Sequence, residues 1–158
     1  MSVFAWIEET RLALWVGESL WGYPILLSLH IVGLAIVAGI FTVLNLRLLG
    51  ILKDIEFSPL IGLFRLAWLG LIINTLSGLG LFSSQATTFV TNIPFLVKIT
   101  AIFIGVVIAT RILKKIRRGA SDWDAGTSSP DQPVKILAAV SLLIWTTAIV
   151  GGRLIAYL

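Results

Sequence analysis

The chain has 158 residues, of which 58% are hydrophobic and only 13% are charged. A soluble domain carries about a quarter charged residues, so this composition excludes an ordinary water-soluble globule and indicates a single membrane domain. The absence of cysteine excludes disulfides, thiolate metal sites and cysteine nucleophiles. The net charge of +4 does not indicate a nucleic-acid partner, because the basic residues cluster beside apolar segments, where membrane topology explains them.

The N-terminal segment 2–20 is predicted to be an amphipathic helix that lies in the membrane interface. Its apolar residues recur at helical spacing, but Glu8, Glu9 and Arg11 interrupt any run that could span a bilayer. Tryptophan suits the headgroup level, where one side of the indole is dry and the other wet. The segment and its end hold three such residues, at Trp6, Trp15 and Trp21.

Four apolar runs follow, and a proline lies at or just before the start of each. The predicted spans are 24–50, 59–83, 94–116 and 133–157. Each exceeds the roughly 20 residues that cross about 30 Å of hydrocarbon, and each is expected to be a helix, because open strands leave backbone groups unsatisfied in lipid. Glycines in these spans favour close helix packing. The predicted fold class is therefore all-α, a four-helix transmembrane bundle preceded by an interfacial helix.

Lysine and arginine predict the orientation of the bundle. Three basic residues lie in or beside the first connection, and six lie in or beside the third, at 117–132. The second connection, at 83–93, has no charge. The positive-inside rule then places the first and third connections in the cytoplasm. We expect a multi-pass protein of the bacterial inner (cytoplasmic) membrane, with both termini in the periplasm.

The only histidine of the chain lies inside the first span. His30 is six residues from the predicted outer end, about 9 Å deep at 1.5 Å per residue. Lys98 and Arg153 lie at the outer ends of the third and fourth spans, and Asn74 and Ser77 lie in the outer half of the second. No acidic residue lies inside the spans. Since an ionisable residue in an apolar span is a functional-site candidate by default, these residues predict a polar site near the outer side.

Three interpretations of this site stay open. A b-type haem would use His30 as a metal ligand, with Gly33 on the same helix face leaving room for a flat ring, and with Lys98 and Arg153 pairing with the propionates. A second axial ligand is missing, because the chain has one histidine, no cysteine and only Met1 as methionine. Alternatively, the cations hold an anion, or the polar head of a lipid or a quinone. In the third interpretation the polar residues only fasten helices and reach lipid phosphate.

A haem or a quinone at this site predicts a cofactor-binding redox protein, and the third interpretation predicts a non-enzymatic accessory or structural subunit. A transporter is disfavoured, because no span has interior acids or a broken-helix pair. Whether the protein is an enzyme stays open. The predicted partners are the lipid bilayer and either further copies of the chain or a larger membrane complex.

Two stretches resemble signatures of an uncharacterised bacterial family of small four-helix membrane proteins. One runs from Ser28 through His30 and Gly33 to the Leu-Arg-Leu-Leu-Gly sequence that ends at Gly50, and the other runs from Ser141 to Tyr157. The family is distantly similar to copper-resistance D-type proteins, the membrane protoporphyrinogen oxidase of bacteria and two-haem membrane cytochromes. This fold-level likeness implies haem or porphyrin chemistry. Many members carry a second histidine after an asparagine late in the third helix, but 105–111 of this chain has neither.

The orientation has a direct test. A single cysteine placed in the 83–93 connection is unique in this cysteine-free chain, so a membrane-impermeant maleimide reports its side. We expect labelling in intact spheroplasts without permeabilisation. Labelling that appears only after the membrane is opened would reverse the topology.

Overall fold

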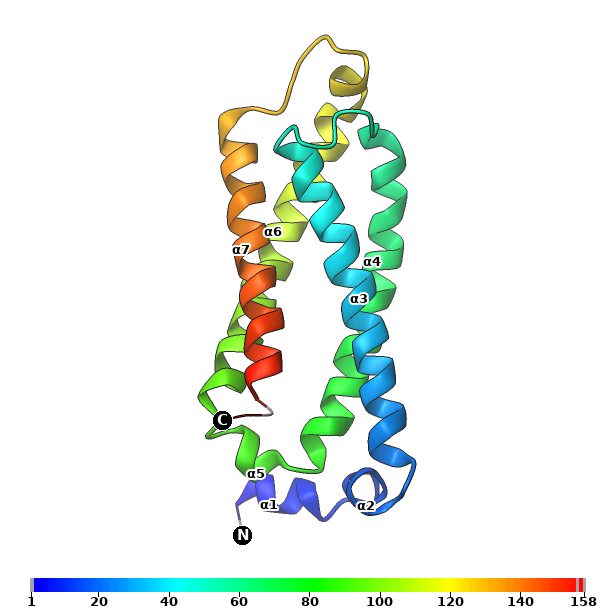
Figure 1. Cartoon of the computed structure of the whole chain (residues 1–158), viewed down its shortest axis with the longest axis vertical. Helices are drawn as coiled ribbons and strands as arrows, with labels where there is room; N and C mark the ends of the chain where they lie inside the picture. Colours follow the sequence, from blue (N-terminus) through cyan, green and yellow to red (C-terminus); the bar gives the residue numbers. More distant parts are fainter. Residues whose placement is uncertain (1, 156, 158) are drawn as a thin grey trace.

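The computed structural model describes residues 2–155 and 157, and in that part of the chain every regular element is a helix. Four long helices run side by side along the molecule (Figure 1). They are α3 (Gly22–Leu48), α4 (Phe57–Ser83), α6 (Ile93–Asp124) and α7 (Gln132–Leu154). All four are long and apolar enough to cross a membrane. The predicted all-α bundle is confirmed.

The two ends of the bundle differ in what covers them. We call the end where α3 and α6 begin and α4 and α7 end the terminal end, and the opposite one the loop end. At the terminal end, α1 (Val3–Glu8) and α2 (Arg11–Glu18) lie across the bundle, with α5 (Ala86–Phe89) beside α1 (Figure 1). Within the bundle α3 packs chiefly against α4, and α6 against α7.

The N-terminal segment forms two short helices where one was predicted. The break comes at Thr10, which has an extended backbone (φ −69°, ψ 151°) and accepts a hydrogen bond from the Ala13 backbone N–H at 3.3 Å. A threonine in this geometry caps a new helix. The second helix, α2, is amphipathic as expected, since it buries Ala13 and Val16 and contacts α3 and α4.

Three of the long helices match their predicted spans to within three residues at each end. The fourth predicted span, 133–157, includes position 156, which lies outside the described residues. The third predicted span, 94–116, lies within α6, but the prediction that 117–124 belong to a connection was wrong, because the helix continues eight residues past 116 to Asp124. Its 32 residues reach about 48 Å at 1.5 Å each, more than about 30 Å of hydrocarbon. The helix is therefore longer than one membrane span requires.

Packing against α4 explains why α6 continues. Ile116 is fully buried, and the Trp123 ring packs edge-on against Phe57 with centroids 5.0 Å apart. A Cβ at Gly119 would lie 2.5 Å from Trp123 Cε2, so this glycine makes room for the indole. The carboxylate of Asp124 then accepts hydrogen bonds from the first two backbone N–H groups of α4. These groups have no partner within their own helix, so the end of α6 caps the start of α4.

The apolar core occupies the loop-end half of the bundle. Phe41 stacks on Trp145 at 5.1 Å and meets Phe64 edge-on at 5.8 Å. Beside this cluster the fully buried Asn45 donates a hydrogen bond to Ser141 Oγ at 3.0 Å. The aromatic cluster and the Asn45–Ser141 bond together hold α3 against α7.

The terminal-end half is less tightly filled. Of the seven buried residues of α3, only Gly22 precedes Gly33. On α3, the first residue of the hydrophobic core cluster is Val37. His30 therefore lies outside the apolar core, in the part of the bundle where polar side chains meet.

One carboxylate ties the N-terminal helices to the bundle. Glu8 Oε1 accepts hydrogen bonds from the backbone N–H of Thr87 at 2.9 Å and from its hydroxyl at 2.7 Å. The backbone bond, followed by the hydroxyl bond, lowers the pKa of Glu8 below its ordinary value. The contact joins α1 to α5.

The Glu8–Thr87 contact is predicted to be pH-dependent. Because the pKa of Glu8 is lower in the folded state, the contact stabilises the fold fully above the ordinary pKa and is lost as the pH falls through the lowered one. We expect amide exchange at Thr87 to be slower in the wild type than in Glu8→Gln at neutral pH, and the difference to vanish at acid pH. Glu9→Gln is the control, and an equal effect of both variants would contradict the assignment.

Candidate functional site

The imidazole of His30 uses both of its nitrogens. Nδ1 lies 2.9 Å from the backbone oxygen of Asn74 and 3.3 Å from Ser77 Oγ, both on α4. Nε2 lies 3.1 Å from Nζ of Lys98 on α6. A carbonyl oxygen only accepts and an ammonium only donates, so Nδ1 carries the proton and Nε2 accepts from Lys98. The one histidine thus joins three of the four long helices.

Asn74 returns the hydrogen bond that His30 makes to it. Its Nδ2 donates to the backbone oxygen of His30 at 2.8 Å. The two backbones approach closely because a Cβ at Gly33 would lie 2.7 Å from both the Asn74 nitrogen and the Gly70 oxygen. Gly33 was expected to leave room for a cofactor, but the backbone of α4 fills that room. Gly33 therefore serves the α3–α4 contact.

Two other glycines lie directly against the two key side chains. A Cβ at Gly78 would be 3.0 Å from Cε1 of His30. A Cβ at Gly152 would be 3.3 Å from Cδ and 3.4 Å from Nζ of Lys98. Each glycine leaves just the space that its neighbour occupies, one on α4 and one on α7. All four long helices thus contribute to the position of the His30–Lys98 pair.

Lys98 is a half-buried ammonium with unused hydrogen-bonding capacity. It makes one hydrogen bond, to His30, and neither a second one nor an ion pair with any described residue. An ammonium has three N–H donors. Lys98 therefore offers donors and positive charge inside an apolar bundle.

Arg153 does not join this pair. Its side chain is exposed, and its guanidinium carbon lies 6.0 Å from the ring centroid of Tyr157. Among the described residues it makes no hydrogen bond to His30 or Lys98. The sequence-predicted set therefore divides into a joined pair and a separate arginine at the terminal end of α7.

A haem ligated by His30 would have to displace Lys98 from Nε2. The Nδ1–H bond to a backbone carbonyl is one that orients metal-binding imidazoles, and it leaves Nε2 for the iron. Nε2, however, already accepts from Lys98, and the ring edge lies against Gly78. No group of three or more His, Cys, Asp or Glu residues in the described part of the chain is arranged to hold a metal ion.

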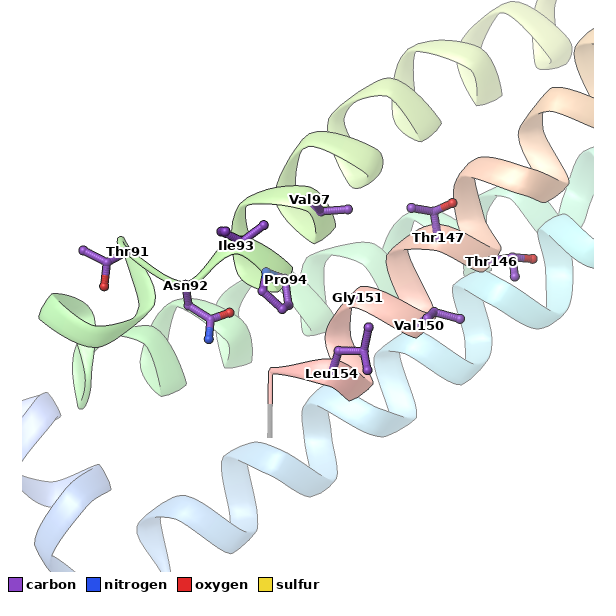
Figure 2. Close-up of a pocket in the computed structure, with 10 residues that line it drawn as sticks. All are labelled: Thr91, Asn92, Ile93, Pro94, Val97, Thr146, Thr147, Val150, Gly151 and Leu154. Atoms are coloured by element: carbon purple, nitrogen blue, oxygen red, sulfur yellow. The ribbon is translucent and has the colours of Figure 1, made fainter. Parts of the chain in front are cut away.

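A groove of about 740 Å³ lies beside the pair, between the first turn of α6 and the last turns of α7 (Figure 2). Gly151 lines this groove, and a Cβ there would lie 3.5 Å from Lys98 Cβ. Lys98 Nζ itself turns toward His30 and does not line the groove. The complete lining is Thr91, Asn92, Ile93, Pro94, Val97, Thr146, Thr147, Val150, Gly151 and Leu154.

The sequence belongs to a known family. The family of unknown function DUF6644 matches residues 3–158, so the chain is a member of it over nearly its whole length. No curated protein and no solved structure matches the chain significantly. Membership of a family without an assigned activity agrees with the resemblance. The similarity to copper-resistance D-type proteins and haem cytochromes stays a prediction.

Sequence reasoning missed the glycines that position the pair. Gly78 and Gly152 are visible only as small residues in apolar spans, a signal that predicts a close contact without naming the partner. Asn74 was predicted to lie at the right depth, but its exchange of hydrogen bonds with His30 depends on helix rotation. The depth of a residue in the membrane follows from charge and span length. Which neighbouring helix its side chain faces depends on how the helices pack.

One added methyl group tests the contact between the His30 ring and Gly78. Gly78→Ala is expected to displace the ring and destabilise the protein by about 1–3 kcal/mol, as overpacking does. Gly62→Ala in the same helix is the control, because nothing lies within 4 Å of its Cβ position; it should be neutral or stabilise by at most about 1 kcal/mol. Thermal unfolding in detergent gives both values. Equal stabilities of the two variants would contradict the contact.

Proposed function

We propose that this protein binds a lipophilic redox cofactor of the quinone class at the terminal end of the bundle, through Lys98 and His30. The observation that carries the proposal is the ammonium of Lys98, which lies 3.1 Å from His30 Nε2 and has no ion-pair partner among the described residues. The positive-inside rule predicts that this end faces the periplasm.

The pair offers the two hydrogen-bonding groups that a quinone and its quinol need. A quinone carbonyl accepts, and Lys98 has N–H donors beyond the one given to His30. A quinol hydroxyl donates, and the lone pair of His30 Nε2 is the acceptor that Lys98 uses in its absence. A neutral ring suits the apolar surroundings better than a free anion, whose burial costs far more.

A structural role is the second candidate, and a specific observation favours it. The hydrogen bonds of His30 to Asn74 and Lys98, and that of Asn74 to His30, all join two different helices. Such bonds fasten membrane helices, at about 0.6 kcal/mol each on average. On this alternative the protein is an accessory membrane subunit, and Lys98 binds nothing besides His30 and lipid.

Quinone content separates the two candidates. We expect solvent extracts of the purified protein to contain quinone, and Lys98→Met to reduce it about 10- to 100-fold, because a hydrogen bond to a charged group contributes about 1.5–3 kcal/mol. Lys114→Met, an exposed lysine near the loop end of the same helix, should leave the content unchanged. Equal quinone in all three proteins, or none in the wild type, would favour the accessory role.

The absorption spectrum provides a second check on the cofactor. After expression with added haem precursor, the quinone proposal expects no Soret band in the purified wild type. A Soret band that disappears in His30→Ala would overturn the proposal and assign haem to the site. Thermal unfolding of each variant shows whether a lost signal reflects lost folding.

A further inference from the structure

The groove between α6 and α7 opens toward the membrane rather than toward the bundle interior. Its residues Val97, Thr147 and Val150 are exposed, whereas the buried face of α7 contains Trp145 and Ala148. Figure 2 shows Pro94 and Val97 on the α6 side of the gap, and Thr147, Val150 and Leu154 on the α7 side. In a bilayer this opening meets acyl chains, because these helix surfaces have no water beside them.

The groove is about as long as the hydrocarbon of one leaflet is thick. From Thr146 to Leu154 it follows eight steps of α7, about 12 Å at 1.5 Å per residue. Half of the hydrocarbon thickness is about 15 Å. The α6 wall consists of the first residues of that helix, so the groove ends where α6 begins at the terminal end.

Polar donors lie where the groove reaches the membrane surface. Arg153 follows Val150 by three residues and Thr146 by seven, so it continues the same face of α7. Opposite it, Asn92 Oδ1 accepts from the Phe95 backbone N–H at 2.9 Å, which leaves the amide NH₂ of Asn92 as a donor. No acidic residue lines the groove. An apolar channel that ends in a cation and an amide donor complements an acyl chain attached to a phosphate.

We propose that this groove binds one phospholipid of the leaflet at the terminal end. An acyl chain lies between Val97 and Val150, and the phosphate accepts hydrogen bonds from Arg153 and from the Asn92 amide. The site uses neither His30 nor Lys98, so it is independent of the proposed cofactor site. It also gives a role to Arg153, which the His30–Lys98 pair leaves out.

A second copy of the chain is the competing occupant, and charge argues against it. A two-fold interface places the same patch on both subunits. Two arginines would then lie at one apolar interface without a carboxylate from the groove residues to neutralise them. A phospholipid supplies the missing negative charge in the molecule that covers the groove.

The test fills the groove with a larger side chain at one of its lining residues. Thr147→Trp places an indole in the groove, and the matched control is Thr42→Trp, an exposed threonine of α3 outside it. Native mass spectrometry of the detergent-purified protein counts the retained phospholipids. We expect one retained phospholipid in the wild type and in Thr42→Trp, about tenfold lower occupancy in Thr147→Trp, and a loss in Arg153→Gln that is greatest for anionic lipids.

Further outcomes decide the remaining points. Lys98→Met should retain its phospholipid even where it loses quinone, which distinguishes this site from the cofactor site. Equal phospholipid retention in Thr147→Trp and the wild type overturns the proposal, as does a wild type that retains none. A dimer mass that Thr147→Trp abolishes, with no change in bound lipid, assigns the groove to a second copy. Val150→Phe repeats the test if Thr147→Trp does not fold.

Discussion

Hydrocarbon offers no hydrogen-bond partner, so a polar side chain inside this bundle must find one on its own helix or on a neighbouring one. His30 meets this requirement at both ring nitrogens, and Asn74 completes the exchange with its own amide. In the apolar core, Asn45 Oδ1 and Trp145 Nε1 are buried without a partner among the described residues. An unsatisfied buried group costs about 1–3 kcal/mol. The imidazole of His30 is therefore better satisfied than the Asn45 and Trp145 side chains.

The fold could be predicted from the sequence because the bilayer limits the choices. Span length and the need to satisfy the backbone dictate four helices, and proline lies in the first turn of each. The end of α6 could not be predicted in this way. Gly119 falls in 117–132, which was predicted to be the third connection, but it is the residue that Trp123 requires to pack across it. A glycine that breaks a helix and a glycine that admits a ring have the same local sequence signal.

The depth of the site residues in the membrane could be predicted from the sequence, but the contacts between them could not. The charge pattern placed His30, Lys98 and Arg153 at one end of the bundle, and the structure brings the first two to within 3.1 Å. Arg153 lies one residue before the end of α7, and its side chain is exposed. The rotation of each helix is decided by close contacts such as that of Gly33 with the backbone of α4. Those contacts depend on pairs of helices, which no single span encodes.

The choice of lysine at position 98 argues for more than helix fastening. A neutral side chain such as glutamine can donate one hydrogen bond to His30 Nε2, and it avoids placing a charge in an apolar site, which translocon scales put at about 2.5–3.5 kcal/mol. Lys98 bears that cost and uses one of its three donors on His30. The surplus of charge and donors is explained if a further acceptor comes to the site. His30 then positions the ammonium, because its Nε2 lone pair accepts one of the three Lys98 donors and leaves the other two for the ligand.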